Sequence, residues 1–282
     1  MKIGISGSNG FVGSHLKSYL SKMLQAEIVS IPRNLLYEDP KEMAVLLKNC
    51  QIIINLAGAS VASRWTKKRM QELRCSRIAT TQNLARAISL LNKKPKLFIS
   101  TSAVGIYDDT GLHDEFSENY SNGFLSLLCQ EWEAATKPIS AIGVRTVIFR
   151  LGLVLSLHGG MLKKIIPFFK LGLGGKMGNG QQTFPFVHLE DLLRAYKHVI
   201  LNDQAEGIYN LVAPEIITNF EFTRSLKLHF KKPSFFTVPA FLLNLVFLRG
   251  SDVLLIGQKV VSERLKTEGF SFQRKTINDI YG

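Results

Sequence analysis

The chain has 282 residues, of which 46% are hydrophobic and 20% are charged. This length and composition fit one large or two smaller packed domains, and they exclude disordered, collagen-like and low-complexity chains. Lys and Arg outnumber Asp and Glu by 35 to 22, and the net charge of +13 favours anionic partners. The basic residues are scattered, and no zinc-finger spacing or RNA-binding aromatic motif accompanies them, so we expect no nucleic-acid partner.

The cysteines and the apolar runs indicate the compartment. Cys50, Cys75 and Cys129 are far apart and odd in number, which is typical of a protein in a reducing compartment. Residues 1–5 lack a signal-peptide pattern, and the apolar run 238–248 is too short to span about 30 Å of hydrocarbon. The histidines show no metal-ligand spacing. We therefore expect a cytoplasmic protein with no membrane partner and no bound metal.

Strand-like and helix-like segments alternate in the first half of the chain. Short apolar runs predict strands over 2–6, 27–31, 51–55, 96–100 and 145–151. Helical periodicity covers 11–24, 66–91 and about 123–141. Apolar strands that alternate with helices predict an α/β fold with a doubly wound parallel sheet, covered by helices on both faces.

The pattern changes after residue 155. Glycines interrupt the stretch 157–182, and a helix-like segment at 189–201, a strand-like one at 208–212 and a helical one at 219–230 follow. We predict a nucleotide-binding domain over 1–155 and a small α+β substrate lobe over most of 156–282. Elements at about 183–212 are expected to return to the sheet.

A glycine-rich loop lies between the first strand and the first helix. The glycines Gly7, Gly10 and Gly13 permit a tight turn, let the backbone approach a pyrophosphate, and let the helix pack on the sheet. The free N–H groups at the helix start attract phosphate. This context predicts a Rossmann-type dinucleotide site formed by Gly7, Ser8, Asn9, Gly10, Phe11, Val12 and Gly13.

The end of the second strand indicates which dinucleotide binds. An acidic residue there would bind a ribose 2′-hydroxyl, whereas an arginine accommodates a 2′-phosphate. The sequence Ile31-Pro32-Arg33 places a guanidinium at this position and no acid. We therefore predict NADP(H) as the cofactor, with a solvated loop charge as the alternative interpretation of Arg33.

Further motifs resemble a known superfamily. The glycine loop, Asn55-Leu56-Ala57-Gly58, and the segment 100–107 resemble the extended branch of the short-chain dehydrogenases/reductases. Cys129-x-x-Trp132-Glu133 and the C-terminal Gly257-Gln258-Lys259-Val260 are similar to an atypical, epimerase-like family within it. The resemblance implies cofactor contacts from Leu56, Ala57, Gly58, Ser100 and Thr101. It also implies a homodimer through the helices at 66–91 and 123–141.

The chain departs from the superfamily at its catalytic pair. Members transfer hydride with a Tyr and a Lys four residues later on one helix, and with a Ser on the neighbouring strand. Ser102 is present, but Leu125 occupies the Tyr position and Cys129 the Lys position. Arg77 stands where the superfamily usually has Asn. The usual proton donor is therefore missing.

Several residues remain as candidates for the chemistry. Ser102 is expected to face the nicotinamide, and Tyr107, Cys129, Arg77 and His188 are the other catalytic candidates. Each has a structural alternative: Tyr107 fills the strand end, Cys129 is a core residue, Arg77 pairs with an acid and His188 caps a helix. We place the substrate near the following residues: Gln181, Gln182 and His188.

Together these features predict an NADP(H)-binding, epimerase-like oxidoreductase. Its substrate is expected to be a small polar molecule, either a carbonyl compound or one resembling a sugar nucleotide. The alternative is a noncatalytic NADP(H)-binding redox sensor or interaction protein related to cell division, because the usual Tyr–Lys pair is absent.

Overall fold

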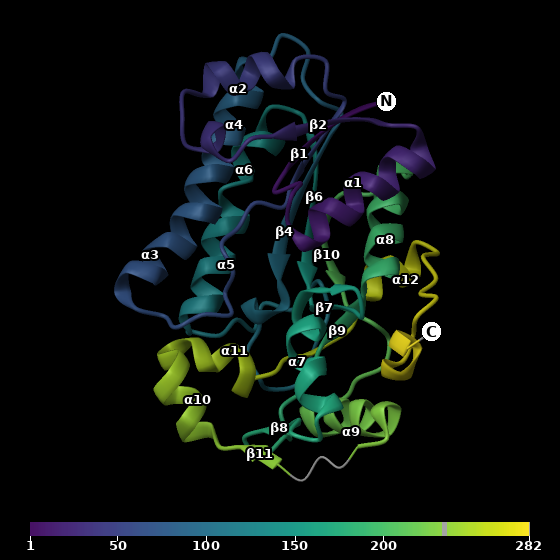
Figure 1. Ribbon diagram of the computed structural model, residues 1–282. Coiled ribbons are helices and arrows are strands. Elements are labelled where there is room, and N and C mark those ends of the chain that lie inside the picture. Colours follow the sequence, from purple (N-terminus) through teal and green to yellow (C-terminus); the bar gives the residue numbers. More distant parts are fainter. Residues whose placement is uncertain (233–235, 282) are drawn as a thin grey trace.

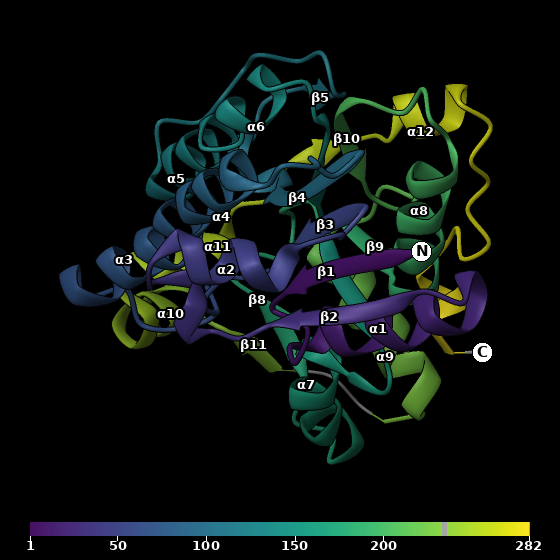
Figure 2. The ribbon, with the colours of Figure 1, turned by 90° about the horizontal axis from the view of Figure 1, so that it is seen from above.

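The computed structural model describes residues 1–232 and 236–281. A six-stranded, fully parallel sheet has the order β10-β6-β4-β3-β1-β2, and Figure 2 shows β2, β1, β3 and β4 side by side. Its strands are β1 (Lys2–Ser6), β2 (Glu27–Ile31), β3 (Ile52–Asn55), β4 (Leu97–Ala103), β6 (Arg145–Leu151) and β10 (Gly207–Leu211). The predicted doubly wound α/β fold is confirmed.

The sheet is buried on both faces because its strands are apolar at successive positions. In β3, Ile52 and Ile54 contribute to one core and Ile53 to the other. In β4, Ile99 contributes to the same core as Ile52 and Ile54, and Phe98 contributes to the core of Ile53. Successive strand residues point to opposite faces, so a continuous apolar run requires a helical layer on each side.

The two helical layers come from different parts of the chain. One face is covered by α1 (Phe11–Leu24) and α8 (Leu189–Leu201), with α12 (Glu263–Thr267) beside β10. The other is covered by α2 (Pro40–Leu47), α4 (Thr80–Leu90) and α6 (Lys137–Ala141), and Figure 1 shows the layers on either side of the strands.

Two predicted helices differ in detail from the structure. The stretch 66–91 consists of α3 (Lys67–Arg74), a π-helical turn (Cys75–Ala79) and α4. The prediction of a single helix over 123–141 is wrong, because the chain forms α5 (Phe124–Ala134) and then α6. Pro138, in the first turn of α6, has no N–H to continue the ladder of α5, and proline favours the start of a helix.

The second lobe has a core of its own. The strands β7 (Leu153–Ser156) and β9 (Phe186–His188) pair with each other. They share this core with α7 (Gly160–Lys170) and α9 (Asn219–Phe230). The glycine-rich stretch includes β8 (Gly175–Met177), which pairs with β11 (Phe236–Val238). The strand β5 (Leu112–His113) pairs with β12 (Lys259–Val260). The helices α10 (Ala240–Phe247) and α11 (Asp252–Leu255) lie at the lower left of Figure 1.

The topology determines where a ligand can bind. The chain runs from β1 to β2 on one side and then returns to β3 on the other, so the strand order reverses at β1. In open parallel sheets such a switch point leaves a crevice at the carboxyl ends of the strands. Within residues 1–232 and 236–281, no helix is long and apolar enough to cross a membrane.

Candidate functional site

The glycine loop has a backbone geometry suited to a phosphate. Gly7 has φ +68°, and a β-carbon there would lie 2.8 Å from the Leu56 backbone. A β-carbon on Gly13 would lie 2.2 Å from the Gly7 carbonyl oxygen, so the close packing of α1 requires glycine. Gly10 caps α1 without a side-chain hydrogen bond, and the first turn holds no acidic residue. The helix N-terminus can therefore receive an anion.

A cleft of about 710 Å³ opens beside this loop. Because the predicted dinucleotide would place its adenosine here, we call this cleft the adenosine half. Arg33 lies at its edge with an exposed side chain, directly after β2. Phe11, Val12 and Gly13 begin α1 without lining the cleft. The predicted cofactor residues that do line it are Gly7, Ser8, Asn9, Gly10, Arg33, Leu56, Ala57 and Gly58.

Arg69 is a second cation in the adenosine half, and sequence reasoning missed it. Its guanidinium donates to Glu72 at 2.6 Å and to the Ser63 hydroxyl at 3.0 Å. Arg69 belongs to no motif in the sequence, because it is one of the scattered basic residues. The signal that could have identified Arg69 is its place in the first turn of the helix that follows Gly58, close to the carboxyl end of β3.

The cleft continues past the end of β3 into a space of about 360 Å³. Because Ser102, the residue expected to face the nicotinamide, lines this space, we call it the substrate half. Leu56 and Gly58 line both halves, so the two spaces adjoin. Thr101, Ser102, Cys129 and Arg77 line the substrate half. The structure therefore brings three catalytic candidates from three different elements to one place.

Ser102 is anchored by a buried ion pair. Its Oγ donates to Glu133 Oε1 at 2.7 Å, and that carboxylate accepts two hydrogen bonds from Arg150, at 2.8 and 2.7 Å. The side chains of Arg150 and Glu133 are 1% and 12% exposed. Burial alone would lower the pKa of Arg150, but the hydrogen bonds and charge of Glu133 raise it above its ordinary value. Sequence reasoning did not identify this pair.

Cys129 and Arg77 lie together at the same end of the cleft. Burial raises the pKa of the Cys129 thiol to about 11, so the thiol is protonated at neutral pH. The Glu133 charge raises that pKa further, whereas Arg77 opposes the shift. Arg77 Nη2 donates to the Ala59 carbonyl at 2.9 Å, and its guanidinium carbon lies 5.2 Å from the Trp132 ring centroid.

Tyr107 lies outside both halves of the cleft. It is fully buried, and its hydroxyl accepts from Arg150 at 2.7 Å and lies 2.9 Å from Asn210 Oδ1. Burial raises its pKa to about 12. Ser100 is also buried in the sheet and lines neither half. The structure thus separates these two residues from the other candidates.

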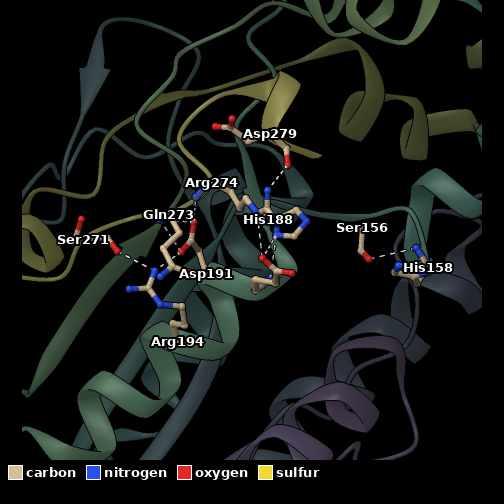
Figure 3. Close-up of polar contacts among 10 residues, drawn as sticks. Ser156, His158, His188, Asp191, Arg194, Ser271, Gln273, Arg274 and Asp279 are labelled. Atoms are coloured by element: carbon tan, nitrogen blue, oxygen red, sulfur yellow. Dashed lines mark hydrogen bonds and ion pairs between the residues drawn. The ribbon is translucent and has the colours of Figure 1, made fainter. Parts of the chain in front are cut away.

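The three predicted substrate residues lie in different places. Gln182 lines the substrate half and donates to the Leu254 carbonyl at 2.9 Å, whereas Gln181 is exposed and does not line it. His188 caps α8, because its Nδ1 accepts from the Glu190 N–H at 3.2 Å. Figure 3 shows His188 near Arg274, and His188 lines neither half of the cleft.

Comparison with known proteins supports the dinucleotide fold. The family model described as the NAD dependent epimerase/dehydratase family matches residues 3–211, and one described as a domain of unknown function, DUF1731, matches residues 238–280. An epimerase family protein of Mycobacterium bovis is 33% identical over 293 residues, covering 99% of this chain and 96% of the relative. Epimerase family protein SDR39U1 of Bos taurus is 34% identical over 284 residues, and the alignment covers 96% of this chain and 95% of the relative.

A solved structure is similar over nearly the whole chain. The human epimerase family protein SDR39U1 (isoform 2), crystallised with NADPH, aligns with a TM-score of 0.91 and 29% sequence identity. The alignment covers 99% of this chain and 97% of the human one.

Proposed function

The chain belongs to the NAD dependent epimerase/dehydratase family, and from that membership we propose that it is an NADP(H)-dependent enzyme that interconverts a carbonyl group and an alcohol. It is an epimerase-like protein that binds NADP(H), as the human relative crystallised with NADPH does. The glycine loop fits the pyrophosphate, while Arg33 and Arg69 supply positive charge for the 2′-phosphate.

The observation that carries the proposal is the continuity of the cleft. Because Leu56 and Gly58 line both halves, a dinucleotide held at the glycine loop can extend toward Ser102. When bound, NADP(H) supplies or accepts the hydride at its nicotinamide ring. This chain's own residues must then orient the substrate and move one proton.

Ser102 serves as a positioning group for the substrate oxygen. Its proton is directed to Glu133, so the lone pairs of Oγ are available to a substrate hydroxyl. The bidentate contact from Arg150 fixes the Glu133 carboxylate, which in turn fixes the Ser102 rotamer. A pre-oriented hydroxyl of this kind loses little entropy when the substrate binds.

Cys129 supplies the proton in the reductive direction. Its thiol is protonated at neutral pH and lines the substrate half, so it can transfer its proton to the alcohol oxygen as that bond forms. The Arg77 guanidinium stabilises the thiolate that remains, and water regains access for reprotonation once the product leaves. Cys129 and Arg77 together thus take the place of the Tyr–Lys pair.

The test compares Cys129→Ala with Cys129→Ser. We expect NADPH to bind both variants with wild-type affinity by isothermal titration. Single-turnover NADPH oxidation over a panel of carbonyl compounds should slow by about 10²- to 10⁴-fold in the alanine variant and less in the serine variant, which keeps a donor. The matched control is Cys75→Ala, because Cys75 does not line the cleft. Full activity in Cys129→Ala would remove Cys129 from the mechanism.

The absent Tyr–Lys pair also favours a second candidate function, a noncatalytic NADP(H) sensor. Leu125, at the Tyr position, offers no proton and lines the substrate half. If NADPH binds tightly but no carbonyl compound oxidises it in single turnover, the sensor is the better account.

A further inference from the structure

The substrate half is predominantly apolar. Among its lining residues two are charged, Arg77 and Asp252, and Asp252 is exposed. Its walls carry aromatic and aliphatic side chains, chiefly Trp65, Phe124, Leu128, Trp132, Met161 and Phe184. Burial of apolar surface contributes about 25 cal/mol per Å², so such walls favour a ligand with an apolar body. A sugar nucleotide would bring a diphosphate, for which this lining offers one cation, Arg77.

Arg77 carries a charge that no carboxylate balances. Its two hydrogen bonds go to the carbonyls of Ala59 and Leu73, at 2.9 and 3.4 Å. Within the described parts of the chain, no ion pair joins it to an acidic side chain. Burial lowers the pKa of Arg77, yet the group stays charged because an arginine side chain is not deprotonated in proteins. A partly desolvated cation of this kind is stabilised by an anionic ligand.

Arg77 and Ser102 together restrict the chemical class of ligand that the substrate half can bind. Arg77, Ser102 and Cys129 all line the substrate half, and the charge of Arg77 lowers the pKa of the Cys129 thiol. The anion-binding group and the group that orients the reacting oxygen therefore face one cavity. A guanidinium matches a carboxylate in bidentate geometry. A carboxylate at Arg77 would thus occupy the same cavity as the reacting carbon.

We propose that the substrate half binds a 2-oxo acid or 2-hydroxy acid with an apolar, aromatic-sized body and its carboxylate on Arg77. The hydroxyl of the 2-hydroxy acid donates to Ser102 Oγ, whereas the C2 carbonyl of the 2-oxo acid accepts from the Cys129 thiol. This inference rests on the proposed function. In the reductive direction C2 gains a hydride and its oxygen gains a proton, so the 2-oxo acid becomes a 2-hydroxy acid while NADPH becomes NADP⁺. Trp65 and Trp132 enclose the apolar body.

Binding of three compounds tests separately the contribution of the Arg77 cation and that of the apolar walls. Phenylpyruvate has both the apolar body and the carboxylate, phenylacetone lacks the carboxylate, and pyruvate lacks the apolar body. Each is titrated by calorimetry into the full chain saturated with NADP⁺. We expect phenylpyruvate to bind at least about tenfold more tightly than either of the others. Equal binding of phenylacetone, or no binding of phenylpyruvate, would overturn the proposal.

Arg77→Gln and Arg77→Lys test the cation itself, with Arg74→Gln as the matched control. Arg74 lies on the same helical segment, pairs with Glu131 and does not line the cleft. Arg77→Gln should weaken phenylpyruvate by roughly tenfold to a hundredfold and leave phenylacetone unchanged, and Arg77→Lys should recover part of the loss.

NADPH titrations of the same proteins distinguish a failure of the proposed function from a failure of the substrate assignment. If wild-type protein does not bind NADPH, the proposed function fails. If wild-type protein binds NADPH but Arg77→Gln weakens NADPH instead of phenylpyruvate, the proposed function survives and the substrate assignment is refuted. If Arg77→Gln does not fold, the three-compound comparison on the wild-type protein and the Arg77→Lys variant decides the assignment.

Discussion

The substitution Glu133→Gln tests whether the buried pair beneath Ser102 supports the fold. It leaves the Arg150 guanidinium, 1% exposed, without its counter-ion, and an amide cannot accept both of its hydrogen bonds. Removing one partner of a buried ion pair costs about 3–5 kcal/mol. At roughly 2–4 °C per kcal/mol, the melting temperature should fall by about 6–20 °C.

The same helix provides the control. Glu131 pairs with Arg74, but the two side chains are 39% and 43% exposed. Solvent screens such a pair, so Glu131→Gln should cost less than about 1 kcal/mol. The two single variants therefore change the same residue type on α5 and differ in the burial of the carboxylate.

Urea unfolding followed by circular dichroism measures the free energy of unfolding for both variants. The double variant Glu133→Gln/Arg150→Met removes the orphaned charge and should recover part of the loss. The reasoning is refuted if Glu133→Gln and Glu131→Gln lower the free energy of unfolding equally. It is also refuted if the double variant is less stable than the sum of its parts predicts.

Three further predictions concern α8 and the cofactor. Burial lowers the pKa of His188 below 6.5. The contribution of His188 to stability is therefore complete above pH 6.5 and is lost as the pH falls. His188→Asn keeps an acceptor for the α8 N-terminus and should weaken this pH dependence in urea unfolding. Arg33→Ala should reduce the preference for NADPH over NADH by roughly tenfold or more in calorimetry, and an unchanged ratio would exclude Arg33 from the 2′-phosphate site. Gly13→Ala should abolish NADPH binding, because its β-carbon would meet the Gly7 carbonyl oxygen at 2.2 Å; wild-type affinity would contradict the loop geometry.

The sequence by itself determined the features that depend on local backbone geometry. The glycines of residues 7–13 were identifiable because a positive φ, a close approach and an uncapped helix start all arise within one short segment. The strands of the sheet were identifiable because burial on both faces demands continuous apolar runs. The helix break at Pro138 was missed, although proline at a helix start is a local signal.

The tertiary structure decided which distant side chains meet. Glu133 and Arg150 are 17 residues apart, and Tyr107 and Asn210 are 103 apart, so no spacing rule relates them. Arg77 faces Trp132 because α5 packs beside the π-helical turn, a contact fixed by helix packing. Residue type alone did not decide whether Tyr107 or Arg77 lies in the cleft. In the folded chain Arg77 lines the cleft, whereas Tyr107 is fully buried and does not line it.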